Sequence, residues 1–248
     1  MCIWRAVSLL TMLVVLIGCE QWREQQARSH LSVRPAVQTA EWAQAWWLPR
    51  HHQKLKDAQL APVDVVMIGD SIMHNWELME LPLWKHNPNG YRELNLGFSG
   101  DRTEQVLWRI QHGAVDGLSP KAVVLMIGTN NTGARFDPAH NTVFAIGRII
   151  QELRSRLPKS KILLLAIFPR AESPDDKLRI RNNEINTRLT QFVDNKTVYF
   201  LDLSDIFLLP DGRINRELVP DALHPKYSAY LLWRQQMAPI ITAFMQGV

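Results

Sequence analysis

Three residues of the types that carry out acyl transfer follow apolar segments of the chain. Ser71 comes two residues after the apolar segment 63–69, and Asp221 and His224 lie beyond the last such segment. A serine hydroxyl becomes a nucleophile when a neutral imidazole accepts its proton, and a carboxylate holds that imidazole in the right tautomer. Because Asp221 and His224 are three residues apart, one loop can carry both. The residues predict a serine hydrolase with Ser71, His224 and Asp221 as its catalytic triad.

Acyl transfer also needs hydrogen-bond donors for the negative oxygen that forms at the carbonyl carbon. The sequence offers three candidates at the ends of apolar segments: the Ser71 N–H at a helix start, the Gly97 N–H and the side-chain amide of Asn130. The eight histidines lack the paired spacing of metal ligands. We therefore expect an oxyanion hole built from these donors, and no metal or cofactor.

Three side chains adjoin the catalytic candidates in the sequence: Ile72, Thr129 and Leu223. We expect them to flank the acyl group and to leave room for little more than a methyl. Each element alone has a plainer explanation, since Gly-Asp-Ser also suits a turn and Asp-x-x-His a surface pair. Their common position after successive apolar segments favours a catalytic role over these explanations.

The apolar segments alternate with helical patterns, which predicts a doubly wound α/β fold with a parallel sheet. Most of the segments are continuous rather than alternating, as expected for strands covered on both faces. Asp101 with Glu104 and Ser173 with Pro174 are expected to start two of the helices. The expected strands are 63–69, 92–97, 121–128, 161–168 and 197–203, and the expected helices are about 72–80, 101–113, 138–157, 174–193 and 225–246.

Together these motifs resemble the SGNH (GDSL-type) hydrolases, whose four blocks occur here in order. The further stretches "FSGDRTEQVLWRIQHG" and "LHPKYSAY" are similar to the catalytic subunits of intracellular platelet-activating-factor acetylhydrolase and their bacterial relatives. One position departs from the family pattern, because Asn131 stands where the third block usually ends in Asp. The matching blocks are Gly69-Asp70-Ser71, Gly97, Gly128-Thr129-Asn130 and Asp221-Ala222-Leu223-His224.

The resemblance implies a flavodoxin-like three-layer α/β/α sandwich with a parallel five-stranded sheet of order 2-1-3-4-5. In that order strand 5 lies roughly 14 Å from strand 1. Only a long connection can return His224 to Ser71, and the segment 204–224 is long enough. The related catalytic subunits dimerise, so a homodimer is one option that the sequence leaves open.

The N-terminus differs in composition from the rest of the chain. A short apolar run ends in Leu16-Ile17-Gly18-Cys19, which resembles the cleavage site of bacterial lipoprotein signal peptides. We expect a signal peptide over 1–18, a polar tether over 19–45 and the hydrolase domain over 46–248. Cys19 would carry the lipid and anchor the protein in the bacterial cell envelope, on its periplasmic or cell-surface side; loss of labelled palmitate in a Cys19→Ser variant would test this.

Near the start of the domain, Trp42, Trp46 and Trp47 fall close to helical spacing. We expect them to pack onto the domain rather than to form an exposed platform for sugars. The formal charge of +4 is modest, and several basic residues are spread along one helical stretch of the chain. Nucleic acid is therefore not an expected partner.

The sequence thus predicts an esterase that removes small acyl groups, acetyl above all, from a small-molecule, glycan or lipid ester. One alternative with the same chemistry is a lysophospholipase or thioesterase for longer chains. An alternative of another class is a catalytically silent lipoprotein that binds envelope glycans. The intact set of five site residues favours the enzyme.

Overall fold

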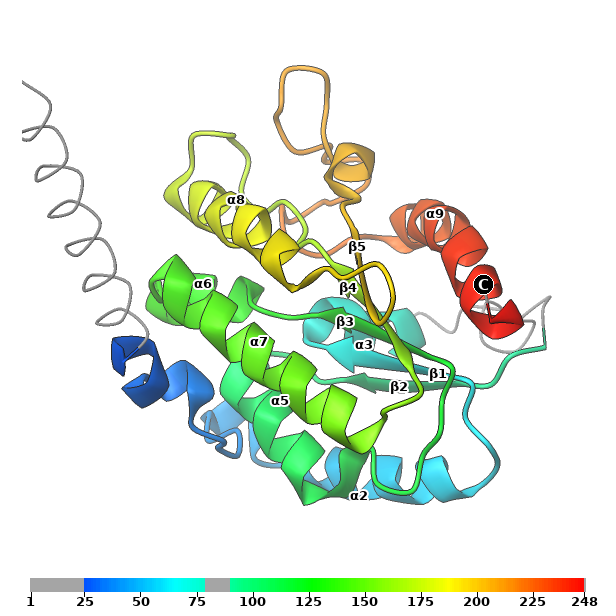
Figure 1. Ribbon diagram of the computed structural model, residues 1–248. Helices are drawn as coiled ribbons and strands as arrows, with labels where there is room; N and C mark the ends of the chain where they lie inside the picture. The colour runs from blue at the N-terminus through cyan, green and yellow to red at the C-terminus, as the bar shows by residue number, and fades with distance from the viewer. Residues whose placement is uncertain (1–24, 79–89, 248) are drawn as a thin grey trace, which may run out of the picture.

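The computed structural model describes residues 25–78 and 90–247 (Figure 1). Their strands form one parallel sheet in the order β2-β1-β3-β4-β5. All five expected strands are present, each shorter than expected by up to three residues, and the expected order is confirmed. The strands are β1 Val65–Gly69, β2 Glu93–Gly97, β3 Ala122–Met126, β4 Lys161–Leu165 and β5 Val198–Leu201.

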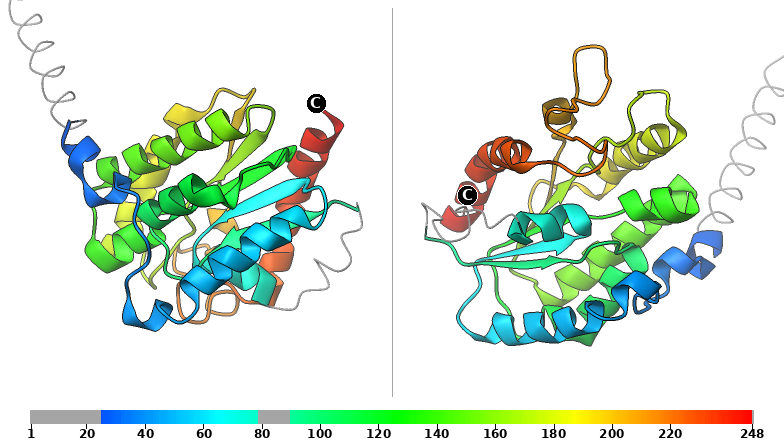
Figure 2. Two further views of the ribbon diagram at one scale, coloured as in Figure 1. Left: turned by 90° about the horizontal axis from the view of Figure 1, so that it is seen from below. Right: turned by 180° about the vertical axis from the view of Figure 1, so that it is seen from behind.

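Helices cover both faces of this sheet (Figures 1 and 2). One face packs against α5, α7 and α8, and the other against α3 and α9. The predicted three-layer α/β/α sandwich is therefore confirmed. The α-helices are α2 Trp47–Gln59, α3 Ser71–Leu78, α5 Thr103–Arg109, α6 Thr129–Arg135, α7 Ala139–Arg156, α8 Lys177–Leu189 and α9 Tyr227–Gln246.

Burial of the strands explains their continuous apolar sequence. In β1, Val66 and Ile68 face the layer of α5 and α7, whereas Val65 and Met67 face the layer of α3 and α9. Successive side chains of a strand point to opposite faces, so a strand covered on both faces needs apolar residues throughout. Within the described ranges, no helix has the length and apolar character needed to cross a membrane.

Two expected helix starts are wrong. The N-cap residue of α5 is Arg102, whose backbone N–H donates to Oε1 of Gln105 at 3.0 Å, and Asp101 is buried outside the helix. Helix α8 begins after Asp176, whose carboxylate accepts the Leu178 N–H at 2.8 Å, and not at Ser173. The Asp101 carboxylate is instead bound by Trp47 and Arg109, and the Ser173 hydroxyl accepts the Asp175 N–H at 3.1 Å.

The described part of the expected tether differs from a free linker. Residues 25–29 are helical, and short 3-10 helices follow at Leu31–Val33 (η1) and Glu41–Ala43 (η2). Ser32 is buried, and its carbonyl accepts a hydrogen bond from Thr103 Oγ1 at 2.8 Å. The segment thus lies along α5 and α7 (Figure 2). Residues 1–24, with Cys19, lie outside the described residues, so the lipid anchor stays a prediction.

Candidate active site

Ser71 is the first residue of α3 and directly follows the turn at the carboxyl end of β1. Asp70 caps the helix, since its Oδ1 accepts the Ile72 N–H at 3.0 Å and its carbonyl accepts the His74 N–H at 2.9 Å. A first-turn N–H has no acceptor within its own helix. The Ser71 N–H is therefore suited to bind an anionic oxygen.

The three triad candidates form one chain of hydrogen bonds. Ser71 Oγ lies 3.0 Å from Nε2 of His224, and Nδ1 of His224 lies 2.7 Å from Oδ2 of Asp221. An ionised carboxylate can only accept, so the proton of the neutral ring is on Nδ1. Nε2 is then left with the lone pair that the Ser71 hydroxyl needs. This is the arrangement of a nucleophile, a base and an orienting carboxylate.

The loop that carries Asp221 and His224 is held by its own backbone. Oδ1 of Asp221 accepts the N–H groups of Leu223 at 3.0 Å and His224 at 2.7 Å. Ala222, which lies between Asp221 and Leu223, has a positive φ of 59°, and its carbonyl accepts the Ala171 N–H at 2.8 Å. A positive φ is costly for a residue with a Cβ and tends to occur at functional sites. These contacts fix the imidazole toward Ser71.

Hydrogen bonds also keep Asp221 charged. Partial burial acts to raise the pKa of this carboxyl, but the N–H groups of His224 and Leu223 and the imidazole outweigh it and lower the pKa below its usual value. The side chains of Asp221 and His224 are 56% and 33% exposed. These two members of the triad are therefore accessible to solvent.

Gly97 does not supply the donor that the sequence analysis expected. Its N–H donates to Oδ1 of Asn95 at 2.7 Å, and its carbonyl accepts from Nε of Arg50 at 3.1 Å. A Cβ on Gly97 would collide with the backbone of His74 in α3. The glycine is required for close packing of α3 on β2, and its N–H is occupied.

Gly100, which was not among the candidates from the sequence, offers a backbone N–H close in sequence to the one expected from Gly97. It lies in the turn after β2 with a φ of +76°, and among the described residues no acceptor is bonded to its N–H. The next residue, Asp101, accepts a hydrogen bond from Nδ2 of Asn130 at 3.0 Å. Gly100 is therefore a neighbour of Asn130, and Ser99-Gly100-Asp101, a typical turn sequence, was the signal that could have identified it.

Asn130 follows β3, as expected, and lies in the first turn of α6, a helix that was not among the expected ones. One of the two Nδ2 hydrogens bonds to Asp101, so the other is left for a ligand. Arg170, which the sequence analysis did not single out, supports this turn. Its Nη1 donates to the carbonyl and the hydroxyl of Thr129, at 2.7 and 3.2 Å. Arg170 is thus a positioning residue for Asn130.

Asn131, the position at which the sequence departs from the family pattern, has a buried side-chain amide with a structural role. Its Nδ2 donates to Thr103 Oγ1 and to Asp137 Oδ2, both at 3.0 Å, and its Oδ1 accepts the Thr103 N–H at 3.1 Å. Both ends of the amide are used, which a carboxylate could not do. Asn131 therefore joins α6 to α5.

Two of the three expected acyl-pocket residues lie elsewhere. The side chain of Ile72 is 1% exposed and packs in the core between α3 and α9. Thr129 is also 1% exposed, and its hydroxyl is engaged by Arg170 and by Asn182. Only Leu223 is partly exposed beside His224. Neither Ile72 nor Thr129 can form the wall of an open pocket.

Asp70 is an unusual neighbour for a nucleophile, because it is almost wholly buried. Burial raises the pKa of its carboxyl to about 7, a rise that the Ile72 N–H and the nearby His224 and Arg170 oppose and Asp101 favours. Asp70 thus changes its charge near neutral pH, one residue from Ser71.

We expect an Asp70→Asn variant to gain stability over the unsubstituted protein as the pH rises. A carboxyl whose pKa is raised on folding stabilises the fold below its ordinary value of about 4, and this stabilisation is lost as the pH rises to about 7. The amide keeps an acceptor for Ile72 and cannot ionise. Urea unfolding at about pH 4 and about pH 8 should show a relative gain of roughly 2–4 kcal/mol. Equal pH dependence in the two proteins would contradict the raised pKa.

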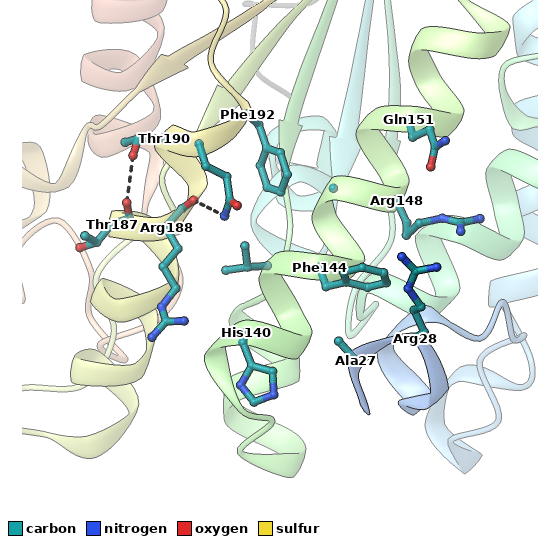
Figure 3. Close-up of a pocket in the computed structure, with 13 residues that line it drawn as sticks. Ala27, Arg28, His140, Phe144, Arg148, Gln151, Thr187, Arg188, Thr190 and Phe192 are labelled. Carbon is teal, nitrogen blue, oxygen red and sulfur yellow. Dashed lines mark hydrogen bonds between the residues drawn. The ribbon is translucent and has the colours of Figure 1, made fainter. Parts of the chain in front are cut away.

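A groove of about 900 Å³ lies between α7 and the end of α8, remote from the triad (Figure 3). Its lining combines Phe144 and Phe192 with the arginines Arg28, Arg148 and Arg188. None of the predicted site residues borders this groove. In the described part of the chain, no group of three or more His, Cys, Asp or Glu side chains is arranged to hold a metal ion.

Comparison with known proteins agrees with this geometry. The model of the GDSL-like lipase/acylhydrolase family matches residues 67–232. Platelet-activating factor acetylhydrolase IB subunit alpha1 of Homo sapiens is 31% identical over 179 residues, which cover 72% of this chain and 75% of the human protein. Subunit alpha2 of Rattus norvegicus is equally similar, at 31% over 72% of this chain and 76% of its own length.

Solved structures share the fold. A GDSL-like lipase from Bacteroides thetaiotaomicron superposes with a TM-score of 0.65 at 21% identity, over 81% of this chain and 98% of its own. A catalytic mutant of an acetylxylan esterase from Geobacillus stearothermophilus gives a TM-score of 0.59 at 17% identity, over 73% and 95% of the two chains.

Proposed function

The chain belongs to the GDSL-like lipase/acylhydrolase family and is a carboxylic ester hydrolase, and on that premise we propose that it removes short acyl groups, acetyl above all, through an acyl-enzyme on Ser71. The observation that carries the proposal is the hydrogen-bonded chain from Ser71 through His224 to Asp221. A family member without activity would have no chemical need to keep these hydrogen bonds.

In the first half of the proposed reaction, Ser71 Oγ attacks the carbonyl carbon of the ester while Nε2 of His224 takes the hydroxyl proton. Asp221 stabilises the imidazolium that results. The tetrahedral intermediate then collapses, the bond to the alcohol oxygen breaks, and His224 returns its proton to that oxygen. The acyl group remains on Ser71 as an ester.

The second half repeats these steps with water. His224 removes a proton from a water molecule, whose oxygen attacks the acyl carbon. Collapse of this second intermediate breaks the bond to Ser71 Oγ, which regains its proton from His224. A carboxylic acid leaves, and the free enzyme is restored.

The oxygen of both intermediates carries a negative charge, and three donors are available to it. We assign them to the Ser71 N–H, the Gly100 N–H in place of that of Gly97, and the second Nδ2 hydrogen of Asn130. All three are fixed before the substrate arrives, which is what makes such donors effective.

An Asn130→Ala variant should lower kcat by ~10²–10³ with little change in KM, because the amide donates to the charged intermediate rather than to the resting ester. Steady-state kinetics with p-nitrophenyl acetate provide the measurement, and the thermal midpoint checks that the turn at Asp101 survives. A rise in KM with kcat retained would contradict the assignment of Asn130 to the oxyanion hole.

The short-acyl preference is supported by Leu223 and by the relatives. Leu223 adjoins the base in sequence and is partly exposed, whereas the buried Ile72 and Thr129 open no apolar channel beside Ser71. Two names among the similar proteins, platelet-activating factor acetylhydrolase and acetylxylan esterase, include the acetyl group. An open apolar groove would instead favour longer chains by ~0.8 kcal/mol for each buried methylene.

We therefore expect kcat/KM for p-nitrophenyl esters to fall from acetate through butyrate to octanoate. A Leu223→Ala variant should raise the butyrate-to-acetate ratio, whereas Leu209→Ala, a matched change of an exposed leucine on the same long segment, should leave it unaltered. An optimum at octanoate would favour the lysophospholipase or thioesterase alternative.

A further inference from the structure

Trp47 is buried, as expected, whereas Trp42 is largely exposed, contrary to expectation, and the pair that it forms with Trp46 lies outside the chemistry described so far. Trp42 is 57% exposed, and its ring stacks on that of Trp46 with a centroid separation of 6.1 Å and an angle of 29°. The indole N–H of Trp46 donates to the Trp42 carbonyl at 3.1 Å, which fixes the two rings relative to each other. We refer to Trp42 and Trp46 as the tryptophan pair.

The tryptophan pair contacts two parts of the chain that adjoin the active site. The ring of Trp42 lies so close to Gly100 that a Cβ there would collide with its Cη2 atom, so it covers the turn that carries the proposed backbone donor. The ring of Trp46 lies 5.6 Å from that of His74. His74 is three residues after Ser71 in α3 and therefore shares a helix face with the nucleophile.

The segment that carries the pair is fixed to the same turn. Nε2 of Gln38 donates to the Gly100 carbonyl at 3.3 Å, and Oε1 of Gln38 accepts the Ala40 N–H at 3.2 Å. The buried Trp47 donates its indole N–H to Asp101 at 2.6 Å. Asp101 is in turn held by the buried Arg109 at 2.8 Å. The exposed ring is thus held rigidly beside the site.

Two exposed polar residues flank Trp42 in the sequence and suit a neutral polar ligand. Glu41 and Gln44, on either side of Trp42 in the sequence, are both exposed and offer hydrogen-bonding groups. The C–H face of a sugar ring packs on the electron-rich face of an indole, while its hydroxyls bind polar side chains at the rim. The carboxylate of Glu41 disfavours an anionic lipid surface.

We propose that the tryptophan pair is a subsite for a sugar ring of an O-acylated, uncharged glycan. The proposal rests on the proposed esterase function and extends it: the glycan would bind on Trp42 and Trp46 while its ester reaches Ser71. The pair would then determine specificity for the alcohol side of the ester, which the sequence alone left open.

The test compares two substrates in one protein. We expect a Trp42→Ala variant to lower the ratio of kcat/KM for O-acetylated xylotetraose to that for p-nitrophenyl acetate by about tenfold, through a higher KM for the glycan. Trp42→Phe keeps an aromatic face and should restore most of the ratio. Leu60→Ala, which removes an exposed apolar side chain at the far end of α2, is the matched control and should not change it.

A loss of both activities in equal proportion by Trp42→Ala would overturn the proposal, because it would indicate a purely structural role at Gly100. If Trp42→Ala lost activity only toward acetylated lysolipid in phosphatidylcholine vesicles, this would also overturn the proposal, and the pair would instead bind a lipid surface. The subsite can be tested apart from catalysis by calorimetry of O-acetylated xylotetraose with the Ser71→Ala protein. Binding that Trp42→Ala abolishes would support the subsite even if no ester were hydrolysed, and absence of binding would refute it.

Discussion

Replacement of Ser71 by alanine is expected to lower kcat for p-nitrophenyl acetate by about 10⁴-fold or more. Without the hydroxyl no acyl-enzyme can form, and only the oxyanion donors remain to assist attack by water. The alanine fits the first turn of α3 and leaves the cap on Asp70 untouched. Steady-state kinetics on both proteins, purified in parallel, give the measurement.

The matched control is Ser99→Ala, which removes another hydroxyl near the site while leaving the proposed chemistry in place. Ser99 Oγ contacts Nδ1 of His74 at 3.0 Å and has no contact with the triad. We expect this variant to keep activity within about tenfold. Residual activity above a hundredth of the original in Ser71→Ala, with an unchanged thermal midpoint, would show that Ser71 is not the nucleophile.

Replacement of His224 by alanine is expected to lower kcat to nearly the same extent, and the two changes together should cost little more than either alone. The hydroxyl of Ser71 is a poor nucleophile without a base at 3.0 Å, so the residues act as one unit. The kinetics of the single and double variants give this coupling directly. Additive losses would contradict a shared step.

Asp221→Asn is the comparison for the His224 result. The amide can still accept the Leu223 and His224 N–H groups, but it would favour the wrong imidazole tautomer. We expect a smaller loss than for Ser71→Ala, since His224 can act in its minority tautomer. A loss as large as that of Ser71→Ala would mean that no productive tautomer is left.

The sequence predicts the sheet well because burial on both faces leaves a strong local record. Segment 121–128 is apolar after Lys121, and β3 occupies its first five buried positions at Ala122–Met126. The strand order is a different matter, since no local pattern states which strands are neighbours. It followed from the family resemblance.

That Ser71, Asp221 and His224 come together was predictable, because Ser71 follows β1 and the other two end the long segment after β5, at the edge where parallel sheets bind their ligands. The proposed oxyanion glycine was not. Gly97 and Gly100 both follow β2, and the choice between them depends on the side chain of Asn95, which occupies the Gly97 N–H. Such a side-chain contact leaves no trace in the spacing of the residues.

The acyl-pocket prediction failed for a related reason. Neighbours in sequence do not share a direction: on a helix, consecutive side chains point about 100° apart. Ile72 follows Ser71 directly, yet it turns into the core and its carbonyl accepts the hydroxyl of Tyr230 at 2.7 Å. Adjacency to a catalytic residue therefore predicts little about which side chains line its pocket.

Covalent labelling with a fluorophosphonate tests the central claim most directly. Ser71 Oγ should attack the phosphorus and displace fluoride, which leaves a stable adduct that peptide mapping by mass spectrometry can assign. We expect a single adduct on Ser71, none on the Ser71→Ala protein and much slower labelling of His224→Ala. An esterase-active protein that carries its adduct on a different residue would contradict the assignment of Ser71 as the nucleophile.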